Sequence, residues 1–192
     1  MRKLKLLSLS LIAVGAGLIT LITAMAQTRA PSRPAAAGLV DASGEMRLPD
    51  DYRTTYEYLG SWAVAADKGS GSKELHSVFA SRGSIAADRS RGAFPDGAVI
   101  VKEGNAAQTD PMTTGIVSRA DALAGWFMMV KDKQNAYPNS KLWGDGWGWA
   151  WFSKANPNKA VTTDYRQECQ TCHIPARDTD WIFTDGYSVL KR

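Results

Sequence analysis

The chain has 192 residues, of which 23 are basic and 19 acidic, so its formal net charge is +4 at pH 7. Three of the basic side chains lie within the first five residues, and a chain cleaved after Ala26 keeps 20 basic and 19 acidic residues, a net charge of +1. A nearly neutral chain offers no basic patch for nucleic acid, and its length predicts one domain with one core.

The first 26 residues are typical of a secretory signal peptide. Arg2, Lys3 and Lys5 precede an apolar run at 6–24, and Ala24-Met25-Ala26 provides a cleavage site with small residues at the required spacing. The apolar run is also close to the length that a membrane-spanning helix needs, so an uncleaved anchor stays open as an alternative. Both forms predict export, and we expect a periplasmic protein.

Residues 27–38 read QTRAPSRPAAAG and have no apolar period, which predicts a flexible linker ahead of one domain at 39–192. Within that domain, four β-branched or aromatic runs predict strands, and turn-forming residues bound most of them. The runs lie at 76–80, 98–102, 126–130 and 147–152. In the last of them Trp147, Trp149 and Trp151 alternate, so they share one strand face, where core packing explains them better than a redox role.

Helices are expected at 84–91 and at 163–172, with Thr162 or Thr163 as the N-cap of the second. Four strands separated by loops favour an antiparallel sheet. The predicted fold class is therefore α+β, mainly an antiparallel β sheet with a few helices, one of which lies near the C-terminus.

The two cysteines of the chain both lie in the segment Cys169-Gln170-Thr171-Cys172-His173. Thiols at i and i+3 fall on one side of a helical turn, where they can add to the two vinyl groups of a haem while the adjacent histidine ligates the iron. A zinc site would need further ligands, and His76 is the only other histidine. A dithiol switch would need a βαβ context, and a disulfide is the remaining alternative. The segment predicts a c-type haem on Cys169 and Cys172 with His173 as iron ligand.

A lysine ends the predicted strand at 98–102. Ala98, Ile100 and Lys102 share one face of that strand, because side chains alternate with period two. A lysine that continues an apolar face can reach a buried ring edge, and desolvation favours the neutral amine that attack on porphyrin carbon requires. In the alternative interpretation Lys102 merely ends the strand and extends its amine to water.

Four further side chains are candidates for a sixth iron ligand: His76, Met112, Met128 and Met129. A lone histidine is more often structural. Methionines in a strand are more often part of the core. A six-coordinate electron carrier therefore lacks an identifiable sixth ligand.

Four segments together give the chain a family resemblance: LPDDYR at 48–53, FPDGAVIVKE at 94–103, the Cys-x-x-Cys-His segment, and DWIFTDGYSVL at 180–190. In these the chain resembles the cytochrome P-460 family, which includes the cytochromes c′-beta. The segments span about the whole domain in order. One departure is Ser188, which stands where the family commonly has a proline, and it concerns a local turn rather than the haem.

The resemblance implies a mostly antiparallel β fold, usually a homodimer, with one c-type haem whose proximal ligand is His173 and whose other side is open. Members of the P-460 type oxidise hydroxylamine and carry an additional covalent bond between a lysine and the porphyrin edge, a role that falls on Lys102 here. The cytochromes c′-beta share the fold, lack this bond and bind small gases such as nitric oxide.

Two functions from different classes follow from the resemblance. The first is an oxidase that converts hydroxylamine to nitrogen oxides and passes electrons to a partner cytochrome. Such an enzyme needs a proton acceptor near the iron, for which Glu103, Asp121 and Asp145 are the candidates. The second is a protein that binds nitric oxide or carries electrons without turnover, which an apolar cap made by Phe94 and Phe127 would favour.

Overall fold

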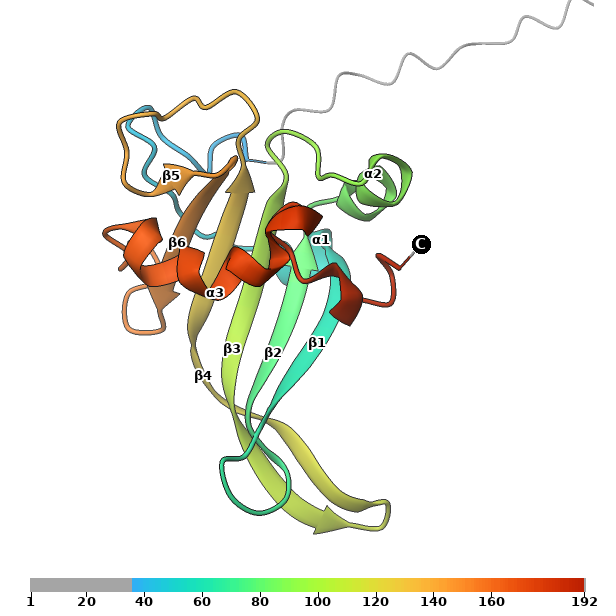
Figure 1. Cartoon of the computed structure of the whole chain (residues 1–192). Coiled ribbons are helices and arrows are strands. Elements are labelled where there is room, and N and C mark those ends of the chain that lie inside the picture. The colour runs from blue at the N-terminus through green and yellow to red at the C-terminus, as the bar shows by residue number, and fades with distance from the viewer. Residues whose placement is uncertain (1–35, 192) are drawn as a thin grey trace, which may run out of the picture. The chain divides into compact units, whose positions relative to one another are not determined.

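The computed structural model describes residues 36–191 (Figure 1). The expected signal peptide at 1–26 and most of the expected linker at 27–38 lie outside the described residues, so both stay predictions. Among residues 36–191 no helix has the length and apolar character needed to cross a membrane.

A six-stranded sheet forms the centre of this part of the chain, and its strands pair in the order β1-β2-β3-β4-β6-β5. Every pair is antiparallel. The strands are β1 (Glu57–Ala65), β2 (Ser72–Ala80), β3 (Val99–Met112), β4 (Gly115–Lys131), β5 (Trp143–Gly144) and β6 (Trp147–Ser153). The predicted α+β class is confirmed, and the four predicted strands correspond to parts of β2, β3, β4 and β6.

β3 and β4 run further than predicted, as a long hairpin (Figure 1). Their outer halves are polar and largely exposed, so no alternating apolar pattern predicts them as strands. Met112 ends β3 at the turn of this hairpin, where 59% of its surface is exposed. β1 is not among the predicted strands, because Gly60 interrupts it and most of its side chains are at least partly exposed.

α1 (Tyr52–Thr55) is a single turn, and α2 (Ser84–Arg91) has the predicted bounds. Gly83 and Gly92 flank α2 with φ of 85° and 74°, the left-handed conformation that glycine adopts at low cost. The helix predicted at 163–172 is replaced by two short elements, the π-helix η1 (Arg166–Gln170) and α3 (Thr171–His173). Two 3-10 helices that were not predicted follow, η2 (Ile174–Thr179) and η3 (Thr184–Gly186).

The predicted N-cap of this segment is wrong. Thr162 Oγ1 accepts a hydrogen bond from the Trp151 backbone amide, at 2.9 Å, and so joins the segment to β6. Thr163 does not accept from the turn but donates, through its amide and its hydroxyl, to the Glu168 carboxylate at 2.9 and 2.8 Å. A carboxylate that reaches back to amides ahead of it satisfies donors that a helix start leaves unpaired.

The sheet has an apolar cluster on each face rather than the single core expected. One cluster joins Ile100, Met129 and Trp149 to side chains that follow the Cys-x-x-Cys-His segment, among them Trp181 and Tyr187. The opposite cluster joins side chains of the central strands to the N-terminal residues: Val99, Val101, Val130 and Phe152 pack with Leu39, Met46 and Tyr52. Figure 1 shows the segment around α3 running across one face of the sheet. The Cys-x-x-Cys-His segment is therefore held against the first cluster.

Candidate haem site

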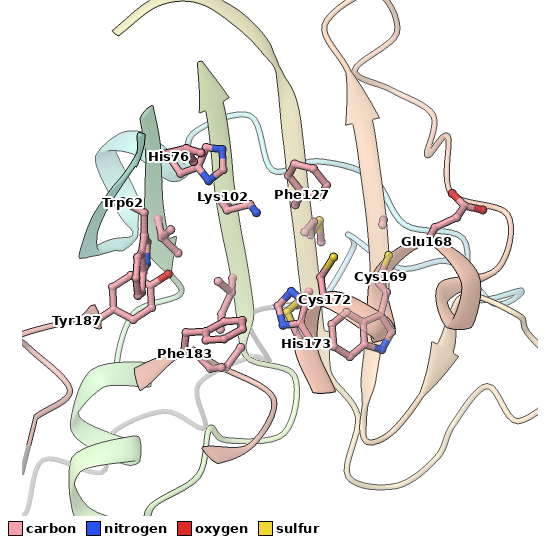
Figure 2. A pocket seen from close by; sticks show the side chains of 18 of the residues that line it. Trp62, His76, Lys102, Phe127, Glu168, Cys169, Cys172, His173, Phe183 and Tyr187 are labelled. Atoms are coloured by element: carbon pink, nitrogen blue, oxygen red, sulfur yellow. The ribbon is translucent and has the colours of Figure 1, made fainter. Parts of the chain in front are cut away.

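A pocket of about 570 Å³ lies between the segment around α3 and the sheet (Figure 2). Its lining is mostly apolar and aromatic, with a few polar side chains, which is the usual composition of cofactor sites. The strands contribute Trp62, Ala63, Val64, His76, Val78, Ile100, Lys102, Phe127, Met128, Met129, Trp149 and Ala150, and the C-terminal part contributes Glu168, Cys169, Cys172, His173, Ile182, Phe183 and Tyr187. The volume falls within the range of small-molecule and cofactor pockets, roughly 300–1,000 Å³.

Both cysteines line this pocket, and neither forms a disulfide. Consecutive helical turns of η1 and α3 put Cys169 and Cys172 on one side of the chain, as i and i+3 residues require. Burial, helped by the charge of Glu168, raises the pKa of Cys169 to about 11. A thiol that stays protonated at neutral pH is a poor nucleophile, which disfavours a dithiol redox switch.

A zinc site also finds no support. Within residues 36–191 no group of three or more His, Cys, Asp or Glu side chains is arranged to hold a metal ion. His76, the one other histidine of the chain, has its Nε2 2.8 Å from Glu74 Oε2.

His173 is oriented as an iron ligand would be. Its Nδ1 lies 2.8 Å from the backbone carbonyl oxygen of Trp181. A carbonyl can only accept, so Nδ1 carries the hydrogen and Nε2 keeps the lone pair that ligates metal. The ring packs edge-on against Trp149, with 5.0 Å between centroids, and 5.7 Å from Phe183. Burial lowers the pKa of His173 against the opposing effect of the Trp181 carbonyl, and this favours the neutral imidazole that binds iron.

Lys102 lies in the same pocket as both thiols and His173 (Figure 2). In the sheet register it stands between Val78 of β2 and Phe127 of β4. Its Nζ is 4.2 Å from the centroid of the Phe127 ring. Burial lowers the pKa of Lys102, although electrostatic interactions with Cys172, Glu74 and Cys169 oppose the change. The amine lies inside the pocket instead of extending away from it, and burial shifts its protonation equilibrium toward the neutral form.

None of the three carboxylates expected beside the iron lines the pocket. Glu103 lies on the opposite face of the sheet, where it accepts hydrogen bonds from the Tyr52 hydroxyl and from Arg53 Nε. Asp121 is exposed on β4. Asp145 accepts hydrogen bonds from the Tyr165 hydroxyl, at 3.2 Å, and from Gln170 Nε2, at 2.6 Å. The prediction for Glu103 is wrong because side chains alternate along β3, so the residue next to Lys102 must face the opposite side of the sheet.

Of the two phenylalanines expected to form an apolar cap, only Phe127 lines the pocket. Phe94 is fully buried against Trp147, with 5.8 Å between ring centroids, so the prediction for Phe94 is wrong. Of the methionines considered as ligands, Met129 belongs to the cluster on the pocket side and Met128 to the opposite cluster. Both are buried in the core and also contribute to the pocket lining.

Sequence reasoning missed several side chains that complete the pocket. Trp62 comes from β1, and Phe183 and Tyr187 come from the residues after η2. Trp62 packs edge-on against Tyr187, with 5.8 Å between centroids, and the two close one side of the pocket (Figure 2). Glu74 was missed as the partner of His76; it does not line the pocket and is exposed, but its i, i+2 spacing on β2 puts both side chains on one face.

An antiparallel sheet with a Cys-x-x-Cys-His segment over a pocket on one face is the arrangement of a haem-binding cytochrome. The family described as Cytochrome P460 matches residues 49–184. The chain therefore belongs to the cytochrome P460 family and is a haem cytochrome. No curated protein matches the chain in a sequence comparison.

Proposed function

We propose that this protein is a periplasmic mono-haem c-type cytochrome that oxidises hydroxylamine and passes the electrons to a partner cytochrome. The observation that carries the proposal is the position of Lys102, whose amine shares one pocket with Cys169, Cys172 and His173. In the P-460 type the lysine bond to the porphyrin accompanies hydroxylamine oxidation, and a lysine in this pocket is a condition for that bond.

The residues of the pocket have separate roles in this proposal. Cys169 and Cys172 would hold the haem by thioether bonds, and His173 Nε2 would ligate the iron. The haem, when bound, would supply an iron that accepts electrons from the substrate. Lys102 would be the side chain that carries the additional bond, and burial keeps its amine closer to the neutral, nucleophilic form. The apolar lining excludes water from the substrate.

Oxidation of hydroxylamine releases protons, so the pocket needs a proton acceptor. His76 is the histidine of the lining besides His173, and its Nε2 lies 2.8 Å from Glu74 Oε2. A ring whose Nε2–H donates to a carboxylate keeps Nδ1 as the acceptor nitrogen. In this proposal the Glu74–His76 pair is the proton acceptor. Glu103, Asp121 and Asp145 cannot be, because they do not line the pocket.

A second candidate function is the binding of nitric oxide without turnover, as in the cytochromes c′-beta. The apolar lining and the position of Phe127 favour it, because a small neutral gas needs no proton acceptor. Electron exchange is compatible with both functions, since Cys172 and Ile174 are exposed and leave this edge of the site accessible to a partner protein. A homodimer, which the family resemblance implies, is part of both proposals.

The ferrous absorption spectrum of the exported holoprotein tests the proposal, together with its Lys102→Leu variant. A Soret band far to the red of ordinary c-type haem, lost in the variant along with hydroxylamine oxidation, would support the oxidase. Lys73→Leu is the matched control, because Lys73 is a lysine of β2 that pairs with Asp67 at an exposed position. An ordinary c-type spectrum in the wild type, with saturable nitric oxide binding, would overturn the oxidase in favour of the gas binder.

A further inference from the structure

The carbonyl that orients His173 belongs to a turn with an unusual backbone. Asp180 and Trp181 are consecutive residues with φ of 57° and 66°, and neither is glycine. The left-handed region is unfavourable for side chains other than glycine, asparagine and aspartate, and a bulky residue such as tryptophan is rare there. Such a conformation persists only where the surroundings hold it in place.

Three contacts hold Asp180 in this conformation. Lys131 Nζ lies 2.5 Å from Asp180 Oδ1, the Phe94 amide donates to Oδ2 at 3.3 Å, and Trp147 Nε1 donates to the backbone carbonyl at 3.0 Å. Lys131 is the last residue of β4, and Trp147 is the first residue of β6. The turn is therefore fixed to the ends of two neighbouring strands of the sheet.

The ion pair between Lys131 and Asp180 is unusually well shielded from water. The Lys131 side chain is 7% exposed and the Asp180 side chain 15% exposed. Lys131 Nζ also lies 4.6 Å from the centroid of the Trp147 ring, a cation–π contact. Trp147 therefore contacts Lys131 through its ring and Asp180 through its Nε1–H. A buried pair of this kind does little for net stability compared with an apolar pair of the same volume. What it provides is a fixed position for the turn.

We propose that Lys131 and Asp180 are positioning residues for the iron. By holding the left-handed turn, they fix the Trp181 carbonyl against His173 Nδ1–H and so set the donor strength of the proximal histidine. Metal-ligating histidines are tuned by the partner of their second nitrogen: a short, fixed hydrogen bond gives the imidazole more anionic character and stabilises ferric iron. The proposal rests on the proposed ligation of iron by His173 and does not depend on the substrate.

The test uses the ferrous and ferric holoprotein with four variants: Lys131→Met, Asp180→Asn, the double variant with both changes, and Lys131→Arg. Each single neutralising change strands one buried charge, so it lowers the stability of the fold whatever else it does. The double variant removes both charges together, and asparagine tolerates the left-handed conformation of position 180. Stability is therefore expected to recover in the double variant, while the Lys131–Asp180 ion pair stays absent and the hydrogen bond from Trp147 to the backbone carbonyl of residue 180 remains.

The two measurements are the iron–histidine stretching frequency of the ferrous protein, by resonance Raman spectroscopy, and the reduction potential. We expect a lower frequency in the double variant and a ferrous-to-ferric equilibrium shifted about tenfold toward ferrous, which is about 59 mV for one electron. Lys131→Arg, which keeps the cation, is expected to stay near the wild type. Lys73→Met, at the exposed Lys73–Asp67 pair, is the control for loss of a lysine charge.

The outcomes separate the positioning role of the Lys131–Asp180 pair from the ligation of iron by His173. A double variant that folds and shows the wild-type frequency and potential would overturn the positioning role alone. A wild-type ferrous protein without an iron–histidine band would overturn the ligation by His173 and the positioning role together. A change in frequency and potential that the double variant shows and Lys131→Arg does not would support the ligation and the positioning role.

Discussion

Lys102 and Phe127 are register partners on β3 and β4, and the lysine amine lies over the phenyl ring, with 4.2 Å from Nζ to the ring centroid. Phe127 itself is 39% exposed, whereas the Lys102 side chain is only partly exposed. The pair explains how a lysine stays within an apolar pocket. The ring attracts the cation weakly, and burial, which is the largest cause of the lowered pKa of Lys102, shifts the amine toward its neutral form.

We expect Phe127→Ala to lower the yield of the bond between Lys102 and the porphyrin. Without the ring, water reaches the amine, the pKa of Lys102 returns toward its ordinary value, and less of the nucleophilic form is present. The yield is measured by mass spectrometry of haem-bearing peptides from the purified holoprotein. Ile116→Ala, at an exposed position on β4, is the control, and an unchanged yield in Phe127→Ala would show that the ring does not protect the amine.

We expect His76→Gln to lower hydroxylamine oxidation by about 10²-fold while leaving nitric oxide binding within about twofold of the wild type. Glutamine keeps a polar side chain of similar length but accepts no proton at neutral pH. The proton acceptor matters for turnover and has no part in binding a neutral gas. Steady-state rates and gas titrations on the same preparations check this. Lys73→Gln, three residues earlier on β2, is the control, and a His76→Gln enzyme with the wild-type rate would remove His76 from the mechanism.

The two thiols of the haem-free protein are expected to differ in their pH dependence. Burial raises the pKa of Cys169 to about 11, whereas Cys172 is exposed. Alkylation of a chain produced without export, in which no haem is attached, should modify Cys172 first and Cys169 only as the pH approaches about 11. In denaturant both should react alike, with a midpoint near the ordinary thiol pKa of about 8.5. Equal rates at pH 8 in the native protein would contradict the burial of Cys169.

The raised pKa of Cys169 makes the free energy of unfolding of the haem-free protein depend on pH. Between about pH 8.5 and 11 the unfolded chain releases the Cys169 proton and the folded chain keeps it, so the unfolded state binds fewer protons. The free energy of unfolding of the haem-free protein therefore falls as the pH rises through this window. A Cys169→Ser variant should lose that dependence, which urea unfolding at pH 8 and pH 10 measures. Cys172→Ser is the matched control, and an equal fall in the Cys169→Ser variant would assign the effect to another group.

The sequence predicted the elements in which side chains follow a regular pattern. Alternation at 98–102 placed Ile100 and Lys102 on one face of β3, and both line the pocket. The i, i+3 spacing of Cys169 and Cys172 placed both thiols on one side of the chain in the same way. Local periodicity is a property of a single element, so it can be read without knowing what packs against that element.

The parts that the sequence did not predict depend on contacts between distant segments. Asp145 was a candidate proton acceptor, and only the fold shows that it accepts from Tyr165 and Gln170 instead. The left-handed turn at Asp180 and Trp181 carries no glycine signal, because contacts from β4 and β6 hold it rather than local preference. Trp62 likewise reaches the pocket from a strand that has little apolar alternation.

Gly144, in β5, is expected to be intolerant of any side chain. A Cβ there would lie 2.1 Å from the hydroxyl oxygen of Tyr165 and 2.5 Å from its Cζ. Tyr165 has little freedom to move, because it is 1% exposed and stacks on Trp149, with 5.9 Å between ring centroids. Gly144→Ala must therefore push Tyr165, and with it the start of η1, away from the sheet. We expect it to lower the free energy of unfolding by about 1–3 kcal/mol, as overpacking does.

Gly104 provides the matched comparison for this prediction. It lies in β3, and a Cβ there would meet its nearest atoms at 3.9 and 4.0 Å, which is ordinary contact. Gly104→Ala should therefore unfold at a denaturant concentration close to that of the wild type. Because η1 carries Cys169, Gly144→Ala should also lower the fraction of chains that acquire haem, which the ratio of Soret to protein absorbance reports. Equal stability and haem content in the two variants would mean that the position of Tyr165 does not determine where the attachment segment lies.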